Sequence, residues 1–181
     1  LGLDHVLFIA AMYLAATSWR SLILQVTAFT LAHTLSLALT VLGVIEPPAG
    51  IVEPLIAASI VVVAVTIMVR RVPASWKTSI ILIFGLLHGL GFAGVIRGYL
   101  EGAELVTGLI GFNLGVELGQ LAVLAVVAAA ATAIRLALAA AGNGAAYRKL
   151  AVIPAAFVIA AIGTLMLLSR LPVAGDYLPE L

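Results

Sequence analysis

Cysteine is absent from this chain of 181 residues, and charged residues make up only 9% of it. Without cysteine, disulfide bridges and thiolate metal ligands are excluded. A soluble domain is about half apolar and about one quarter charged, whereas 64% of this chain is hydrophobic. The formal net charge of +1 gives no basic footprint for a nucleic-acid partner. These scarcities exclude the water-soluble classes and predict a helical integral protein of the lipid bilayer.

Long apolar runs, separated by proline, glycine or charge, define the predicted spans. A helix needs about 20 residues to cross the hydrocarbon core. The runs predict an all-α, polytopic transmembrane bundle in a single domain, with six helices at about 1–17, 22–44, 51–69, 79–96, 105–134 and 150–168. The chain opens inside an apolar run at Leu1, without an initiator Met. We therefore expect a missing N-terminal part, which would add a seventh span or an extra domain.

Basic residues concentrate in the loops that join odd-numbered to even-numbered spans. Seven of the nine lie there: Arg20, Arg70, Arg71, Lys77, Arg135, Arg148 and Lys149. Cytoplasmic loops of membrane proteins carry an excess of Lys and Arg. We therefore expect these loops in the cytoplasm of a bacterial-type inner membrane, with both ends of the chain facing outward.

Ionisable and amide side chains interrupt the apolar spans, where they are costly and therefore mark functional sites. A rise of about 1.5 Å per residue places them in one slab, from mid-membrane to the outer half. Five helices contribute to this set, which includes all three histidines: Asp4, His5, His33, Glu53, His88, Asn113, Glu117 and Gln120. The shared depth predicts that they converge on one site.

Two opposite stripes run along the fifth predicted span. The polar stripe has the spacing i, i+4, i+7: Asn113, Glu117 and Gln120. The second stripe consists of small residues: Gly111, Gly115 and Gly119. At about 100° per residue the two stripes lie on opposite sides of the helix. We expect the polar stripe to face a polar interior and the glycine stripe to allow close helix packing.

The polar set has the chemistry of a divalent-metal pathway. Imidazole with carboxylate and amide oxygen suits Ni²⁺, Co²⁺ or Zn²⁺. We expect five residues to bind and pass the ion: Asp4, His5, His33, His88 and Glu117. Five more would support them: Glu53, Asn113, Gln120, Thr30 and Ser36. Thr30 and Ser36 would either line a hydrated path or bond to their own helix. No GxxxxGK[ST] motif is present, so the membrane potential or a partner would drive transport.

Other readings of the same residues remain open. Three histidines and an acid also resemble the zinc site of an intramembrane hydrolase, with Glu117 or Asp4 as the base. A metal-binding subunit that does not itself transport is a third reading, with the glycine stripe as a docking face for a partner. Each histidine taken alone could instead be a hydrogen-bonded packing residue.

Five segments together resemble one known family. They are LGLDHVLF (1–8), TAFTLAHTLSLAL (27–39), VEPLIAASI (52–60), FGLLHGLGFAG (84–94) and GFNLGVELGQLAV (111–123). In order and content they resemble the HupE/UreJ membrane proteins, over five of the six spans. The resemblance implies a small bundle associated with nickel or cobalt uptake, sometimes encoded with hydrogenase or urease systems. As a partner we expect either a second copy of the chain, in a homo-oligomer, or a metallo-enzyme maturation protein. Asp4 and His5 match the family's Asp-His pair, and His88 matches its fourth-span histidine. Better-known members carry a second histidine in that span, which this chain lacks.

Overall fold

The structure is a computed structural model that describes residues 2–69, 72–97 and 104–171. Arg70, Arg71, Glu101 and the acidic residues of the tail lie outside these ranges. Within them all regular structure is helical, which confirms the all-α prediction. The six α-helices are α1 (Leu3–Ala15), α2 (Trp19–Val41), α3 (Ala49–Met68), α4 (Ala74–Arg97), α5 (Glu104–Ala140) and α6 (Ile153–Arg170). A short 3-10 turn (Gly144–Ala146) and a π-turn (Arg148–Val152) connect α5 to α6.

The helix boundaries differ most from the prediction in α4 and α5. Helix α4 begins at Ala74, directly after Pro73, rather than at Ser79. Helix α5 continues to Ala140 because Arg135 does not end it. The Arg135 guanidinium lies over the Tyr147 ring, 4.5 Å from its centroid, and so is accommodated on the helix side. The helix stops where Gly142 takes a φ of 74°, a conformation that suits glycine.

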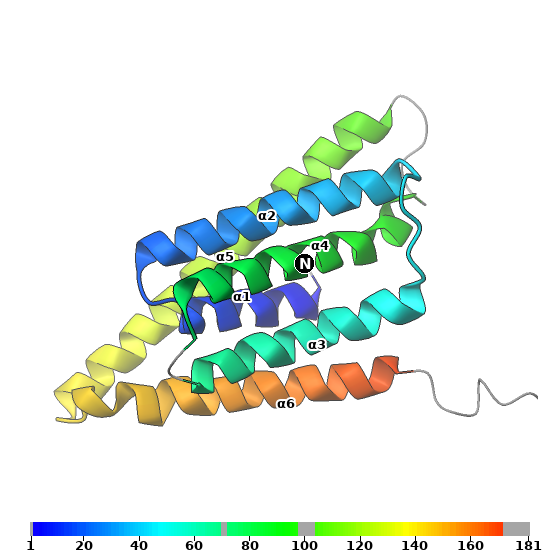
Figure 1. The fold of residues 1–181 in the computed structure, drawn as a ribbon. Coiled ribbons are helices and arrows are strands. Elements are labelled where there is room, and N and C mark those ends of the chain that lie inside the picture. The colour runs from blue at the N-terminus through cyan, green and yellow to red at the C-terminus, as the bar shows by residue number, and fades with distance from the viewer. Residues whose placement is uncertain (1, 70–71, 98–103, 172–181) are drawn as a thin grey trace, which may run out of the picture.

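The helices form two tightly packed pairs around the short first helix. Helix α2 packs along α4 and α3 along α6, while α1 contacts both α3 and α5. Helix α5 crosses the other helices obliquely (Figure 1). The α1–α2, α3–α4 and α5–α6 connections lie together at one end, on the left of Figure 1. We call this the basic end, because five described basic residues lie in or near these connections: Arg20, Lys77, Arg135, Arg148 and Lys149.

Two of these basic side chains cap helix ends. Lys77 Nζ donates to the Ala15 carbonyl oxygen at 2.9 Å, at the end of α1. Arg148 donates to the Ile67 carbonyl oxygen at 2.8 Å, at the end of α3. The last carbonyls of a helix lack intrahelical partners and carry partial negative charge. The basic residues therefore also hold neighbouring helices together.

The outer surface of the bundle is apolar. Four segments are long and apolar enough to cross a membrane: Trp19–Val41, Ala49–Met68, Val106–Ala140 and Arg148–Arg170. In the most apolar window of the third of these, only 6% of the residues are buried inside the chain. A helix so apolar and so exposed needs a lipid environment. The fold is thus that of a membrane protein.

Candidate functional site

Glycines bring α4 unusually close to α2. A Cβ on Gly85 would lie 2.6 Å from the Phe29 carbonyl oxygen. A Cβ on Gly89 would collide with Ser36 Oγ and the His33 carbonyl oxygen. Only glycine permits this backbone approach. His88 lies between the two glycines in sequence, so the contact that they allow sets His88 beside the His33 turn of α2.

The three histidines of the chain gather in the interior. His5 on α1 is 1% exposed, His33 on α2 is 1% exposed and His88 on α4 is 0% exposed. The ring centroid of His5 is 5.6 Å from that of His33 and 5.1 Å from that of His88, and both pairs meet edge to face. The convergence expected from their shared depth is therefore present for the histidines. We call these three residues the histidine cluster.

One hydrogen bond fixes the tautomer of His88. Its Nδ1 lies 2.8 Å from the carbonyl oxygen of Phe84, one turn earlier in α4. Because a carbonyl can only accept, Nδ1 carries the hydrogen and Nε2 presents a lone pair. Nε2 is buried and has no hydrogen-bond partner among the described residues. In metal-binding histidines, the ring nitrogen that does not bind the metal typically donates such a hydrogen bond, which orients the ring.

Phenylalanines wall the cluster, and sequence reasoning did not single them out. The Phe8 centroid is 5.0 Å from that of His88, and Phe29 is 5.2 Å from His88 and 6.0 Å from His33. Both phenylalanines are 0% exposed. The sequence does carry a signal for these contacts, because residues three or four apart share a helix face. Phe8 is three residues after His5, and Phe29 is four residues before His33. The aromatic wall keeps the imidazoles in a water-poor environment.

Asp4 points to a different partner. The Arg170 guanidinium, at the end of α6, lies 3.0 Å from one Asp4 carboxylate oxygen and 3.2 Å from the other. Arg170 also donates to the backbone carbonyl of Glu53 at 3.4 Å, while Glu53 itself is exposed. The sequence alone does not single out Arg170. The structure makes it the counter-ion of a predicted metal ligand.

Helix α5 contributes two of its polar residues to α2. Thr34 donates to Asn113 Oδ1 at 2.8 Å, and Thr30 donates to Gln120 Oε1 at 3.1 Å. Asn113 also interacts with His33, which links this seam to the histidine cluster. Glu117 belongs to the same stripe but is exposed. It lies about 60° round the helix from the buried Gln120, at the margin of the inward face.

Ser36 and the glycine stripe of α5 do not have the roles that were expected of them. Ser36 donates to the Ala32 and His33 carbonyls of its own helix, so it back-bonds rather than lining a path. Gly111 and Gly115 have no atom within 4 Å of the place where a Cβ would stand. The packing role expected of these two glycines is therefore not found among the described residues. Both glycines are exposed, on the side of α5 away from the residues that contact α2.

The described residues contain no group of three or more His, Asp or Glu side chains placed so that they could already hold a metal ion. The histidine cluster is thus close-packed but not arranged as a completed ligand shell. Of the two predicted carboxylate ligands, Asp4 is held by Arg170 and Glu117 is exposed.

The fold and this cluster define a polytopic helical membrane protein with a buried histidine cluster. A sequence model of the HupE/UreJ protein family matches residues 1–170, and the chain belongs to that family. The family is associated with nickel or cobalt transport, or with the maturation of urease and hydrogenase. No curated protein and no solved structure matches the chain.

Proposed function

We propose that the protein passes a divalent transition-metal ion, of the nickel or cobalt type, across a bacterial-type inner membrane. The observation that supports this most is the burial of three imidazoles, from α1, α2 and α4, within one aromatic-walled cluster. A divalent ion in the bilayer interior needs ligands that replace its water. Neutral imidazoles supply such ligands without adding charge.

The ring spacing supports transient rather than permanent ligation. Two imidazoles bound tetrahedrally at about 2.1 Å have ring centroids about 5 Å apart. The observed 5.1 and 5.6 Å are close to that value, although the rings meet edge to face. Small ring rotations would therefore bring two nitrogens onto one ion. Ligands that must move to bind release the ion more readily than a fixed shell, which is what conduction requires.

The carboxylates would act at the margins of this route. Asp4 directly precedes His5, and its release from Arg170 would give the ion a negative partner beside the first imidazole. Glu117 is exposed between two residues that contact α2, so it would meet an ion before the buried cluster does. With the basic end in the cytoplasm, the membrane potential favours cation entry by about 2.3 kcal/mol per charge per 100 mV.

Uptake into proteoliposomes tests the proposal. The purified protein is reconstituted, and entry of Ni²⁺, Co²⁺ and Zn²⁺ is followed with an internal metal-sensitive dye under an imposed potential. We expect at least tenfold slower entry for His88→Gln and His33→Gln, and a clear reduction for Glu117→Gln. Ser59→Ala is the matched control, because Ser59 is buried and bonds only to the Ile56 carbonyl of its own helix.

The outcomes separate the competing readings. Unchanged uptake in both histidine variants would contradict the proposal. Metal binding without uptake in any condition would favour the non-transporting subunit. The hydrolase reading gains less from the geometry, because a general base must be free and close to the histidines. Asp4 is held by Arg170, and Glu117 is exposed on the bundle surface.

A further inference from the structure

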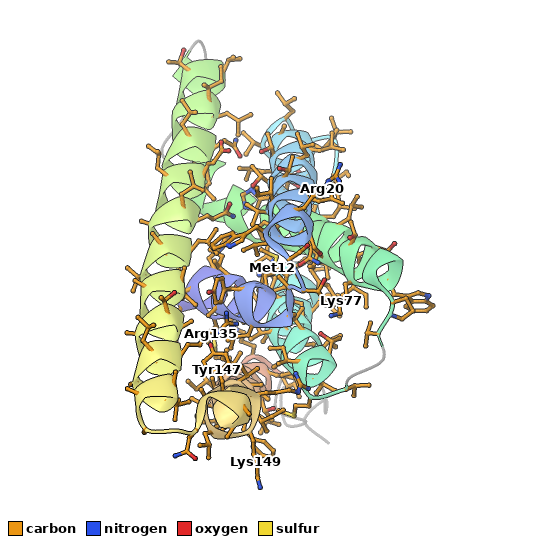
Figure 2. All side chains as sticks on the ribbon, turned by 90° about the vertical axis from the view of Figure 1, so that its left-hand side faces the viewer. Met12, Arg20, Lys77, Arg135, Tyr147 and Lys149 are labelled. Atoms are coloured by element: carbon orange, nitrogen blue, oxygen red, sulfur yellow. The ribbon has the colours of Figure 1, made fainter. Side chains whose placement is uncertain are left out.

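A cavity of about 220 Å³ opens at the basic end, and its lining contains no acidic residue. It lies where the end of α1, the start of α2, α5 and the α5–α6 connection meet. Its polar lining is formed by Tyr13, Thr17, Ser18, Trp19, Arg135 and Tyr147. Figure 2 views this end of the molecule and shows Arg135 next to Tyr147. The histidine cluster and its proposed route do not use this cavity.

The charge in and around the cavity is entirely positive. The described segments at the basic end, residues 16–22, 72–79 and 135–150, contain five basic residues and no Asp or Glu. Lys77 and Arg148 are engaged with helix ends. Arg135 makes no hydrogen bond or ion pair within the described part of the chain, and its guanidinium rests on the Tyr147 ring. A stacked guanidinium keeps its N–H groups available at the ring's edge for an anion.

Neutral donors complete an anion-binding lining. Tyr13, Thr17 and Tyr147 line the cavity, and their hydroxyl groups are of a kind that donates to phosphate oxygens. Helix α2 begins at Trp19, so the positive end of its dipole lies at the same place. A water molecule occupies about 30 Å³ in the liquid, so the cavity has room for on the order of seven waters, or for a phosphate and part of a glycerol.

From these contacts we propose that the cavity binds the headgroup of an anionic phospholipid. A lipid fits better than a free phosphate because apolar residues continue the wall: Leu14, Leu22 and Val152. Trp19 and Tyr13 meet edge to face, 6.2 Å apart, as aromatic side chains of a membrane interface do. Basic pockets between transmembrane helices, at the membrane surface, are suited to acidic headgroups. The bound lipid would brace α1, α2 and α5 against one another.

The chain has only two tryptophans, so Trp76→Phe leaves Trp19 as a single reporter in the cavity wall. This variant is placed in phosphatidylcholine nanodiscs containing equal fractions of brominated phosphatidylglycerol or brominated phosphatidylcholine. Bromine quenches a nearby tryptophan. We expect brominated phosphatidylglycerol to quench Trp19 at least threefold more strongly than brominated phosphatidylcholine. Arg135→Gln should remove that preference, and Arg135→Lys should retain part of it.

Lys149→Gln is the matched control, because it removes one positive charge from the same end without touching the cavity lining. It should leave the preference intact. Equal quenching by the two lipids in the parent protein would overturn the proposal, whatever the variants do. A loss in Lys149→Gln as large as in Arg135→Gln would show only general attraction of acidic lipid, and would overturn it too. Abolition of the preference by millimolar inorganic phosphate would assign the cavity to the free anion instead.

Discussion

The guanidinium of Arg170 donates to both carboxylate oxygens of Asp4, and so ties the last turn of α6 to the first turn of α1. The two residues are at opposite ends of the described chain. Asp4 directly precedes His5, whose ring belongs to the histidine cluster. On the proposed route, an ion that approaches the cluster from this side would meet a carboxylate that already has a cationic partner.

Breaking this ion pair should have different effects on stability and on metal affinity. The pair is partly exposed, 24% for Arg170 and 19% for Asp4, so a double-mutant cycle of Asp4→Asn and Arg170→Gln should give a coupling of about 0.2–1 kcal/mol in unfolding. If Asp4 also serves the ion, Arg170→Gln should tighten Ni²⁺ or Co²⁺ binding severalfold and Asp4→Asn should weaken it. Titration calorimetry on the two purified variants measures these changes in metal affinity. Equal weakening in the two variants would leave the pair a purely structural contact.

An added methyl group should have different effects at Gly89, which packs against α2, and at Gly111, on the exposed stripe of α5. Gly89→Ala would press against Ser36 and the His33 backbone, and should destabilise the bundle by about 1–3 kcal/mol. Gly111→Ala is the control, because nothing lies within 4 Å of its added methyl. That variant should be neutral, or more stable by up to about 1 kcal/mol from helix propensity. Thermal unfolding in one detergent compares them, and equal losses would contradict the close α2–α4 packing described here.

The hydrogen bond from Thr34 to Asn113 should stabilise the α2–α5 contact only modestly. Interhelical hydrogen bonds in membranes average about 0.6 kcal/mol, so a cycle of Thr34→Val and Asn113→Leu should give a coupling near that value. Thr132→Val is a suitable control, because Thr132 is exposed and bonds to the Ala128 carbonyl of its own helix. No coupling between Thr34 and Asn113 would mean that α5 is held by its apolar contacts alone.

Lys77 should matter more to stability than its neighbours at the basic end. Its ammonium group caps α1 through the Ala15 carbonyl, and Lys77→Met should cost about 0.3–1 kcal/mol. Lys149→Met removes the same charge, but no hydrogen bond to a helix end is found for Lys149 among the described residues. It should be nearly silent in the same unfolding assay. Equal effects would indicate that overall charge, rather than the cap, accounts for the loss.

Much of the fold follows from the sequence because lipid imposes one simple rule. Apolar runs of about 20 residues must be helices, so the six helices and their order could be predicted. The end of α5 could not be predicted, because Arg135 suggested a helix boundary at the membrane interface. The stacking of Arg135 on Tyr147 depends on where the α5–α6 connection folds back.

The gathering of the three histidines could be predicted from depth, since the helical rise places His5, His33 and His88 at similar levels in three predicted spans. The partner of Asp4 and the exposure of Glu117 could not be predicted. Asp4 meets Arg170 only because α1 and α6 are neighbours, a tertiary fact that no local pattern contains. Likewise, periodicity puts Glu117 on the stripe of Asn113 and Gln120, but does not fix how far α5 is rotated about its axis. The exposure of Glu117 depends on that rotation.

Metal binding to the purified protein tests most directly whether the three histidines act on one ion. Elemental analysis and X-ray absorption of the Ni²⁺- or Co²⁺-loaded protein would count the metal and its imidazole ligands. We predict one ion per chain with two or three imidazoles, bound at least tenfold more weakly in both His88→Gln and His33→Gln. Tight binding that survives in both variants, or ligation by oxygen alone, would contradict the account.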